Sequence, residues 1–229
     1  EEQIISLANR GKKVILVVVA GRPLSLARVI PYVSAILYVF HPGTGGPEAI
    51  AQILTGEAEP GGRMPVTVPV SEGQIPLYYN SIQVRSDRPE HLKYNDMTEK
   101  PLYCFGYGLT YTDFKVSDIK VDRNEIRKNE SVRVTVNVEN TGTRSGEAVI
   151  QCYINDCVSS LLRPCKELKG FKRVTLDKGE SKIVEFTLGK EELGFFNHKG
   201  EFIVEPGSFR VFVGLDCENT IDTCFVVTD

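Results

Sequence analysis

The sequence of 229 residues has no tryptophan, only two methionines and only three histidines. It also lacks a long apolar run, because the longest, at 14–20, is too short to cross a bilayer. Lys13 precedes this run and Arg22 follows it closely, a pattern that does not fit a signal peptide. No sign of charge dominates, since 27 basic and 30 acidic side chains give a net charge of −3. We therefore predict no nucleic-acid partner and no membrane partner, both of which favour clustered Lys and Arg.

Sequence patterns for metal binding are absent as well. The cysteines show no C-x-x-C spacing and the histidines lie far apart, at Cys104, Cys152, Cys157, Cys165, Cys217, Cys224, His41, His91 and His198. We therefore predict no metal and no other cofactor. The favoured interpretation is free thiols in a reducing compartment, which favours the cytoplasm, and the alternative is disulfides. Cys152 with Cys157, or Cys217 with Cys224, could pair if strand geometry brought their α-carbons close together.

Residues 1–80 show patterns of helix and strand in alternation. An amphipathic segment at 1–10 predicts a helix that Gly11 ends. The further predicted elements are buried strands at 12–21 and 34–40 and helices at 25–30 and 47–55. The order strand, helix, strand, helix predicts a partial parallel sheet with flanking helices. Two strands are too few for a complete doubly wound domain, so we interpret 1–80 as the second half of an α/β domain.

The chain changes character near residue 113. Residues 61–103 are rich in proline and polar side chains and show little periodicity. A segment of this length without periodic structure is typical of a functional or linking loop, and we assign 81–113 to a linker or long loop. From 114 onward, short segments of alternating apolar and polar residues follow one another between turns.

The alternation in 114–229 has the period of β-strands. Apolar residues take every second position in the segment SVRVTVNVE, at Val132, Val134, Val136 and Val138. The segments EAVIQCYIN, SKIVEFTL and SFRVFVGL repeat the pattern between turns such as NTGTRSG and DKGE. About seven short strands predict an all-β, immunoglobulin-like sandwich. Because there is no tryptophan to form the antibody Cys–Trp–Cys hallmark, we favour the fibronectin III type.

Several stretches resemble a known family when they are read in order along the chain. The stretches VILVVVAGRPLSL and HPGTGGPEAIAQILTGEAEPGGRMPVTVP resemble the C-terminal α/β domain of family 3 glycoside hydrolases. PLYCFGYGLTYTDF resembles the segment that leads into their fibronectin III-like domain, and ENTGTRSGEAVIQCYIN and EPGSFRVFVG resemble that domain itself. The resemblance covers nearly the whole chain and depends on several independent motifs.

The resemblance implies a retaining, exo-acting β-glucosidase, or a relative such as a β-xylosidase, that acts on carbohydrate through an Asp nucleophile and a Glu acid/base. In this family the Asp belongs to an N-terminal barrel domain and the Glu to a Gly-Glu loop expected upstream of the first helix. We therefore expect this chain to lack both catalytic carboxylates, to be inactive alone and to need the missing barrel as a partner. Its own loop carboxylates form no recognisable pair: Glu48, Glu57, Glu59, Asp87, Glu90 and Asp96. A homo-oligomer is also compatible with the resemblance.

Two side chains are the candidate substrate-binding residues. Arg22 and His41 directly follow the two predicted parallel strands, and open α/β sheets bind ligands at the carboxyl ends of their strands. They could contact a sugar or the neighbouring barrel, or they could simply cap the strands. The glycine-rich turn at 43–46 precedes a helix N-terminus that could hold an anion. No Lys-Ser/Thr pair follows it, so it is not a P-loop.

Two other function classes are compatible with parts of the sequence. A non-catalytic carbohydrate-binding or protein-interaction module could use aromatic platforms, for which the candidates are Tyr78, Tyr79, Tyr94, Tyr103 and Tyr107. A flavodoxin-like nucleotide-binding domain is disfavoured, because the predicted sheet is half-sized and no phosphate motif is present. Two departures from the usual family pattern also stand out. Cys104 occupies a position where proline is common, and Phe40-His41 one where larger aromatics are common.

Overall fold

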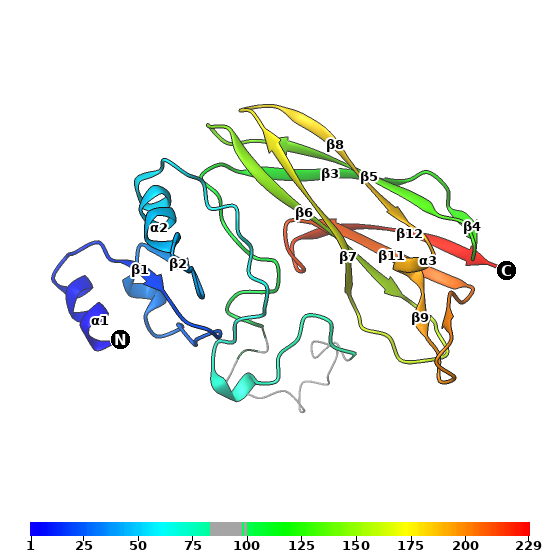
Figure 1. Cartoon of the computed structure of the whole chain (residues 1–229), viewed down its shortest axis with the longest axis horizontal. Helices are drawn as coiled ribbons and strands as arrows, with labels where there is room; N and C mark the ends of the chain where they lie inside the picture. Colours follow the sequence, from blue (N-terminus) through cyan, green and yellow to red (C-terminus); the bar gives the residue numbers. More distant parts are fainter. Residues whose placement is uncertain (83–97, 99) are drawn as a thin grey trace.

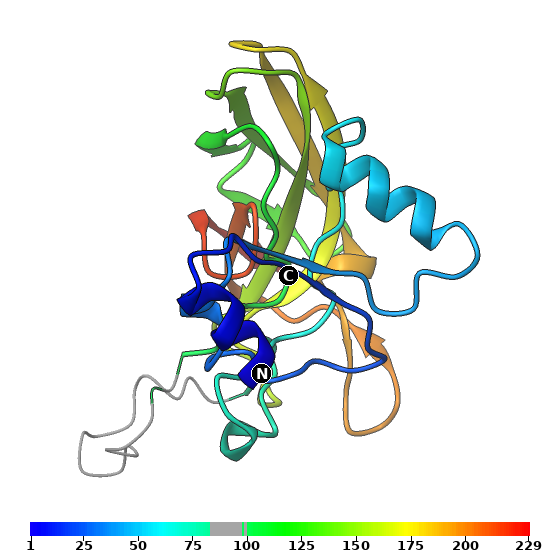
Figure 2. The ribbon, with the colours of Figure 1, turned by 90° about the vertical axis from the view of Figure 1, so that its left-hand side faces the viewer.

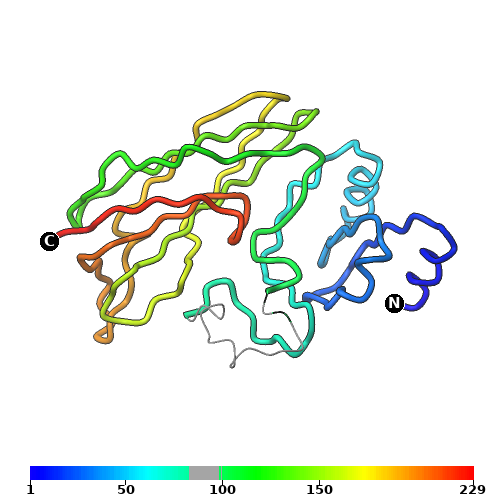
Figure 3. Tube along the Cα trace, turned by 180° about the vertical axis from the view of Figure 1, so that it is seen from behind, coloured from blue at the N-terminus to red at the C-terminus, as the bar shows by residue number. Residues whose placement is uncertain are grey.

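A computed structural model of the chain describes residues 1–82, 98 and 100–229. It contains a small α/β part near the N-terminus and a long β-sandwich that runs to the C-terminus (Figure 1). The two termini lie at opposite ends of the molecule (Figure 3). This architecture confirms the predicted fold class of a partial parallel sheet followed by an immunoglobulin-like sandwich.

The α/β part is built on a single pair of parallel strands. Its elements are α1 (Glu2–Asn9), β1 (Ile15–Val18), the 3₁₀ helix η1 (Ile30–Tyr32), β2 (Ala35–Tyr38), α2 (Gly46–Thr55) and the 3₁₀ helix η2 (Glu72–Gln74). β1 and β2 pair in parallel, from Ile15 opposite Ala35 to Val18 opposite Tyr38. The two α-helices lie apart from one another (Figure 2). Gly56 takes a left-handed conformation with φ +81 directly after α2, which confirms the predicted helix end.

The helix predicted at 25–30 is wrong. Residues 27–29 form a turn, and only Ile30–Tyr32 is helical, as a 3₁₀ turn that contains Pro31. A six-residue segment between prolines is too short to repay the cost of nucleating an α-helix. The Ser25 hydroxyl instead donates a hydrogen bond to the carbonyl of Val70, so tertiary contacts hold this segment in an irregular conformation.

The parallel strand pair leaves apolar surface uncovered in the part of the chain that the structure describes. Strands of a parallel sheet are usually covered on both faces. In β1 only Val18 is buried, whereas Ile15 is 52% exposed and Val19, just after the strand, is 61% exposed. Leu7 on α1 and Leu54 on α2 are exposed as well. This part of the molecule therefore presents apolar surface of the kind that a further layer covers.

Two sheets, mainly antiparallel, form the sandwich. One has the strand order β4 (Glu125–Arg127), β12 (Thr220–Thr228), β11 (Gly207–Gly214), β6 (Gly146–Asp156) and β7 (Glu167–Leu176), with β4 and β12 parallel. The other has the order β3 (Phe114–Val121), β5 (Val132–Asn140) and β8 (Ser181–Leu188). A short helix, α3 (Lys190–Leu193), and the hairpin β9 (Phe195–Phe196) and β10 (Phe202–Ile203) connect β8 to β11.

The alternation of apolar and polar residues in β5 correctly predicts which of its side chains face the core. Val132, Val134, Val136 and Val138 are 0–1% exposed and lie in the core between the sheets, as predicted. Arg133 between them points outward and pairs with Glu185 of β8, with 3.4 Å between the guanidinium and carboxylate atoms. A slip of one residue would exchange the two faces, so the burial of the valines fixes the pairing.

β6 is buried on both of its faces. Its inward side chains, such as Ile150 and Cys152, contribute to the core between the sheets. Its outward side chains Gln151 and Tyr153 are buried too, at 3% and 0% exposed. They are covered by a segment that precedes the sandwich in the sequence, residues 102–107, which we call the junction segment. The α/β part is therefore attached to the sandwich across the outer face of β6.

Candidate functional site

The carboxyl ends of β1 and β2 bring the two predicted substrate-binding residues to one edge. The His41 imidazole lies directly against Gly21, where any added Cβ would collide with its Nε2 atom. The backbone carbonyl of Arg22 accepts a hydrogen bond of 2.5 Å from the Tyr38 hydroxyl on β2. The side chains of Arg22 and His41 are exposed. The strand ends therefore form a common edge with a cationic and an imidazole side chain free to meet a ligand.

The glycine-rich turn at 43–46 is required by the backbone itself. Gly43 has φ +66, and a Cβ at Gly46 would overlap the ring of Pro42. The amide of Gly46 donates to the carbonyl of Gly43 at 3.2 Å, which closes the turn into α2. These contacts explain the glycines without a ligand.

Two of the carboxylates considered above, Glu48 and Glu59, are engaged in structural contacts. Glu48 lies in the first turn of α2, where its charge suits the helix dipole, and accepts a 3.5 Å hydrogen bond from Gln52. Glu59 accepts hydrogen bonds from the backbone amides of Tyr111 and Glu147, both at 3.1 Å. Glu57 is exposed. The other carboxylates considered above, Asp87, Glu90 and Asp96, lie outside the described residues.

Metal-binding geometry is not found in the part of the chain that the structure describes. No three His, Cys, Asp or Glu side chains come together there in a way that could hold a metal ion. His91 lies outside the described residues. All six cysteines carry free thiols. Among the described helices, none is long and apolar enough to cross a membrane.

Most of the candidate aromatic platforms pack inside the molecule. Tyr79 stacks on Phe105 with ring centroids 4.1 Å apart, and Tyr103 stacks on Tyr107 at 5.1 Å. Tyr78, in contrast, is 69% exposed, and Tyr94 lies outside the described residues. Tyr79, Phe105 and Tyr107 belong to the cluster in which the junction segment packs on the sandwich, so these rings are not free to bind sugar rings.

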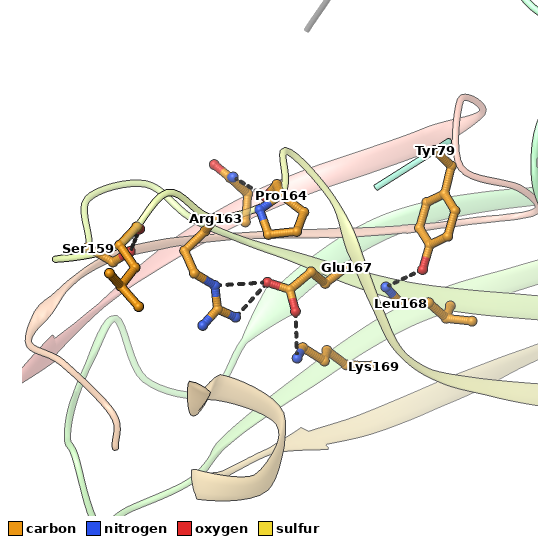
Figure 4. A network of polar contacts seen from close by, with 9 residues as sticks. Tyr79, Ser159, Arg163, Pro164, Glu167, Leu168 and Lys169 are labelled. Atoms are coloured by element: carbon orange, nitrogen blue, oxygen red, sulfur yellow. Dashed lines mark hydrogen bonds and ion pairs between the residues drawn. The ribbon is translucent and has the colours of Figure 1, made fainter. Parts of the chain in front are cut away.

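A buried polar network that we did not predict from the sequence lies where β6 and β7 meet the loop 157–166 (Figure 4). The Arg163 guanidinium donates to Glu167 at 3.1 and 2.5 Å and lies over the Phe195 ring at 4.5 Å. Lys169 completes the network with a 3.0 Å bond to the other Glu167 oxygen. The Arg163–Glu167 ion pair thereby fixes the loop to β7, and both ion pairs of the network have little solvent exposure.

Asp156, at the end of β6, is the unusual carboxylate beside this network. It is only 6% exposed, and burial raises its pKa to about 6 although the nearby Arg163 charge opposes that rise. Among the described residues, its Oδ2 atom and the Nη1 atom of Arg163 have no hydrogen-bond partner. The charged run R-P-C-K-E-L-K was the only sequence signal of this network. The network lies in the sandwich, where its Arg163–Glu167 ion pair binds the loop to β7.

Comparisons with known proteins assign two domains of one enzyme family to the chain. Residues 1–111 match the glycosyl hydrolase family 3 C-terminal domain, and residues 148–217 match the fibronectin type III-like domain. A periplasmic β-glucosidase of Salmonella typhimurium is 42% identical over 93% of this chain, and a putative β-xylosidase of Formosa agariphila is 38% identical over 98%. These matches cover 29% of each relative, so the chain spans about three tenths of their length. The solved structure of a β-glucosidase from Erythrobacter marinus superimposes with a TM-score of 0.92 at 39% identity, covering 99% of this chain and 30% of that one.

Proposed function

Since the chain belongs to glycoside hydrolase family 3, of which it carries the C-terminal and fibronectin type III-like domains, we propose that it is the C-terminal part of a retaining, exo-acting β-glucosidase. The observation that supports this most strongly is the match, over 93% of the chain, to three tenths of the length of a β-glucosidase. A carbohydrate substrate and an N-terminal barrel domain are the partners that the proposal implies.

The chemistry of a retaining glycosidase needs two carboxyl groups about 5–5.5 Å apart, one as nucleophile and one as acid/base. The described carboxylates of this chain have other tasks, as Glu59 illustrates with its two backbone hydrogen bonds. We propose that the nucleophilic Asp and the acid/base Glu are supplied by parts of the parent enzyme outside this chain. The exposed apolar residues Ile15 and Val19 give β1 a surface that those parts can cover.

Arg22 and His41 are the residues of this chain that we propose to contact the substrate. Both project from the edge formed by the ends of β1 and β2, which is where open α/β sheets bind ligands. The Arg22 guanidinium can donate several hydrogen bonds to sugar hydroxyls, and the His41 ring can donate or accept one. Removing a hydrogen bond to a charged group costs about 1.5–3 kcal/mol, which corresponds to roughly 10- to 150-fold in kcat/KM.

The test uses the full-length parent enzyme, with aryl β-glucoside and aryl β-xyloside as substrates. We expect Arg22→Ala and His41→Ala to lower kcat/KM by at least about tenfold without changing the melting temperature. Arg10→Ala is the matched control, because Arg10 is an exposed arginine at the end of α1 in the same part of the chain. Unchanged kinetics in both site variants would contradict the substrate-binding role. A full-length enzyme that hydrolyses neither substrate would contradict the proposed activity itself. Light scattering on the same protein tests the expectation of a homo-oligomer.

A further inference from the structure

Two cysteines that are 113 positions apart in the sequence meet where the junction segment packs on the sandwich. Cys104 belongs to the junction segment, and Cys217 lies in the turn between β11 and β12. The amide of Cys217 donates a 3.1 Å hydrogen bond to the carbonyl of Phe105, which fixes the two backbones side by side. The side chains are 6% and 8% exposed and share one apolar cluster with Tyr153 and Phe212.

The two thiols interact directly in this cluster. The side-chain contact with Cys104 lowers the pKa of Cys217, although burial and the neighbouring charges of Glu218 and Asp216 raise it. The same contact, together with burial, raises the pKa of Cys104 far above its usual range. The Lys166 ammonium, which donates to the Cys217 carbonyl at 2.6 Å, adds a favourable charge for a Cys217 thiolate. Of the two thiols, Cys217 is therefore the one that ionises more readily.

We propose that Cys217 and Cys104 form a peroxide-sensitive thiol pair that closes into a disulfide between the junction segment and the sandwich. A thiolate beside a second thiol is the arrangement in which oxidation by peroxide leads to a disulfide. The oxidant must be small, because both side chains are largely buried, and hydrogen peroxide meets that requirement. The two sulfurs then need to approach to the bond length of about 2.0 Å.

The chemistry balances in two steps. The Cys217 thiolate attacks one oxygen of hydrogen peroxide, the O–O bond breaks, and the departing hydroxide takes a proton to become water, which leaves a sulfenic acid. The sulfur of Cys104 then attacks the Cys217 sulfur, the S–O bond breaks, and the hydroxyl leaves as a second water with the proton of the Cys104 thiol. Two thiols are oxidised to one disulfide and one peroxide is reduced to two waters.

The neighbouring cysteines differ from this pair in their surroundings. Burial in the sandwich core raises the pKa of Cys152 to about 12, so it stays a thiol. Cys165 lies near Cys217, but burial raises its pKa and its sulfur is engaged with the Tyr79 carbonyl at 3.9 Å. Cys165 is therefore the natural control, since it shares the location of the pair without its thiolate.

The experiment treats the whole chain with a small excess of hydrogen peroxide, with and without dimedone, which labels sulfenic acids. Alkylation and peptide mass spectrometry then locate the products. We expect a linked peptide pair containing Cys104 and Cys217, lighter by two hydrogen atoms than the sum of its parts. In Cys104→Ser the link should disappear and dimedone should label Cys217, whereas Cys165→Ser should form the link as the wild type does.

The linked protein should also melt several degrees higher than the reduced protein and return to the original value with dithiothreitol, because the bridge closes a long loop in the unfolded chain. The proposal is overturned if no link forms between Cys104 and Cys217, if oxidation stops at the exposed Cys157 or Cys224, or if Cys165 takes the place of Cys104. It is also overturned if the linked protein melts below the reduced one, because the native positions of the two sulfurs would then not accommodate the bond.

Discussion

Glu59 gives the sharpest test of how the α/β part is fastened to the sandwich. Its two carboxylate oxygens accept hydrogen bonds from the amides of Tyr111 and Glu147, each at 3.1 Å. Glu147 lies on β6, 88 positions further along the chain, so one side chain holds two distant backbones. The fit is close, because a Cβ on Gly146 would lie 2.7 Å from a Glu59 oxygen. Glu59→Ala removes both acceptors at once.

The cost follows from the exposure of the two amides. Tyr111 is exposed, so water can replace the carboxylate there, and the loss is about 0.5–1 kcal/mol. The amide of Glu147 is partly buried, and its charged acceptor contributes about 1.5–2 kcal/mol. The sum is about 2–3 kcal/mol, which for a chain of this length lowers the melting temperature by roughly 4–12 °C.

Thermal unfolding followed by circular dichroism and calorimetry measures the change. Glu57→Ala is the matched control, because Glu57 is an exposed glutamate two positions away and should stay within about 0.5 kcal/mol of the wild type. Glu59→Gln separates the acceptors from the bulk of the side chain, since its amide group turns a donor toward one of the two N–H groups. We expect Glu59→Gln to lower the melting temperature by at least half as much as Glu59→Ala does. If Glu59→Ala melts like Glu57→Ala, the carboxylate does not fasten the two parts and the reasoning fails.

Four further outcomes are expected. The isolated chain should not hydrolyse aryl β-glucosides, and turnover that survives purification but is lost on mutating one of its own carboxylates would refute this. Val134→Ala should lower the free energy of unfolding, measured by chemical denaturation, by about 2–3 kcal/mol. Replacing the exposed Arg133 by Ala should lower it by less than about 1 kcal/mol. Equal losses of stability in the two variants would contradict the register of β5. Because the folded-state pKa of Asp156 is raised to about 6 from 3.8, its contribution to stability is complete below pH 4 and is lost as the pH rises through 6. Asp156→Asn should therefore flatten the fall in melting temperature between pH 4 and 7, and an unchanged slope would refute the assignment. A fragment of residues 114–229 should fold but bind the dye ANS more strongly than the whole chain. The fragment lacks the junction segment and therefore exposes the apolar cluster around Tyr153 and Phe212. Equal dye binding by the fragment and the whole chain would contradict the packing of the junction segment on the sandwich.

The sequence patterns correctly predicted those strands whose side chains are buried or exposed according to the face of their own sheet. Alternation in β5 identified its core face, and the apolar run at 14–20 identified a parallel strand although only Ile15–Val18 is regular. The helix expected at 25–30 failed because the prolines and the contact of Ser25 with Val70 outweigh a weak periodicity. In β6 the same alternation marks Gln151 as solvent-facing, yet the junction segment buries it, with a hydrogen bond of 3.0 Å from its side chain to the Gly106 carbonyl. A two-residue period says nothing about a distant segment that covers the outer face.

For the candidate site, the sequence predicted the position of the residues within the sheet but not their contacts with distant segments. That Arg22 and His41 share an edge follows from two parallel strands and a right-handed connection, which the sequence indicated. Their substrate-binding role stays a prediction. The meeting of Cys104 with Cys217 depends on the approach of two segments that lie 113 positions apart in the sequence. No spacing in one sequence encodes such an approach, so only the three-dimensional structure could reveal this pair.

The burial of the outer face of β6 by an earlier segment has a consequence during synthesis on the ribosome. The junction segment leaves the ribosome before any strand of the sandwich, but Phe212 and Cys217, on which it packs, follow more than 100 positions later. At 5–20 residues per second the aromatic side chains of the segment wait on the order of 10 s for their partners. During that interval Tyr103, Phe105 and Tyr107 form an exposed apolar stretch that a chaperone can hold. Closure of the sandwich and shielding of this stretch become one event, timed by the emergence of β11 and β12.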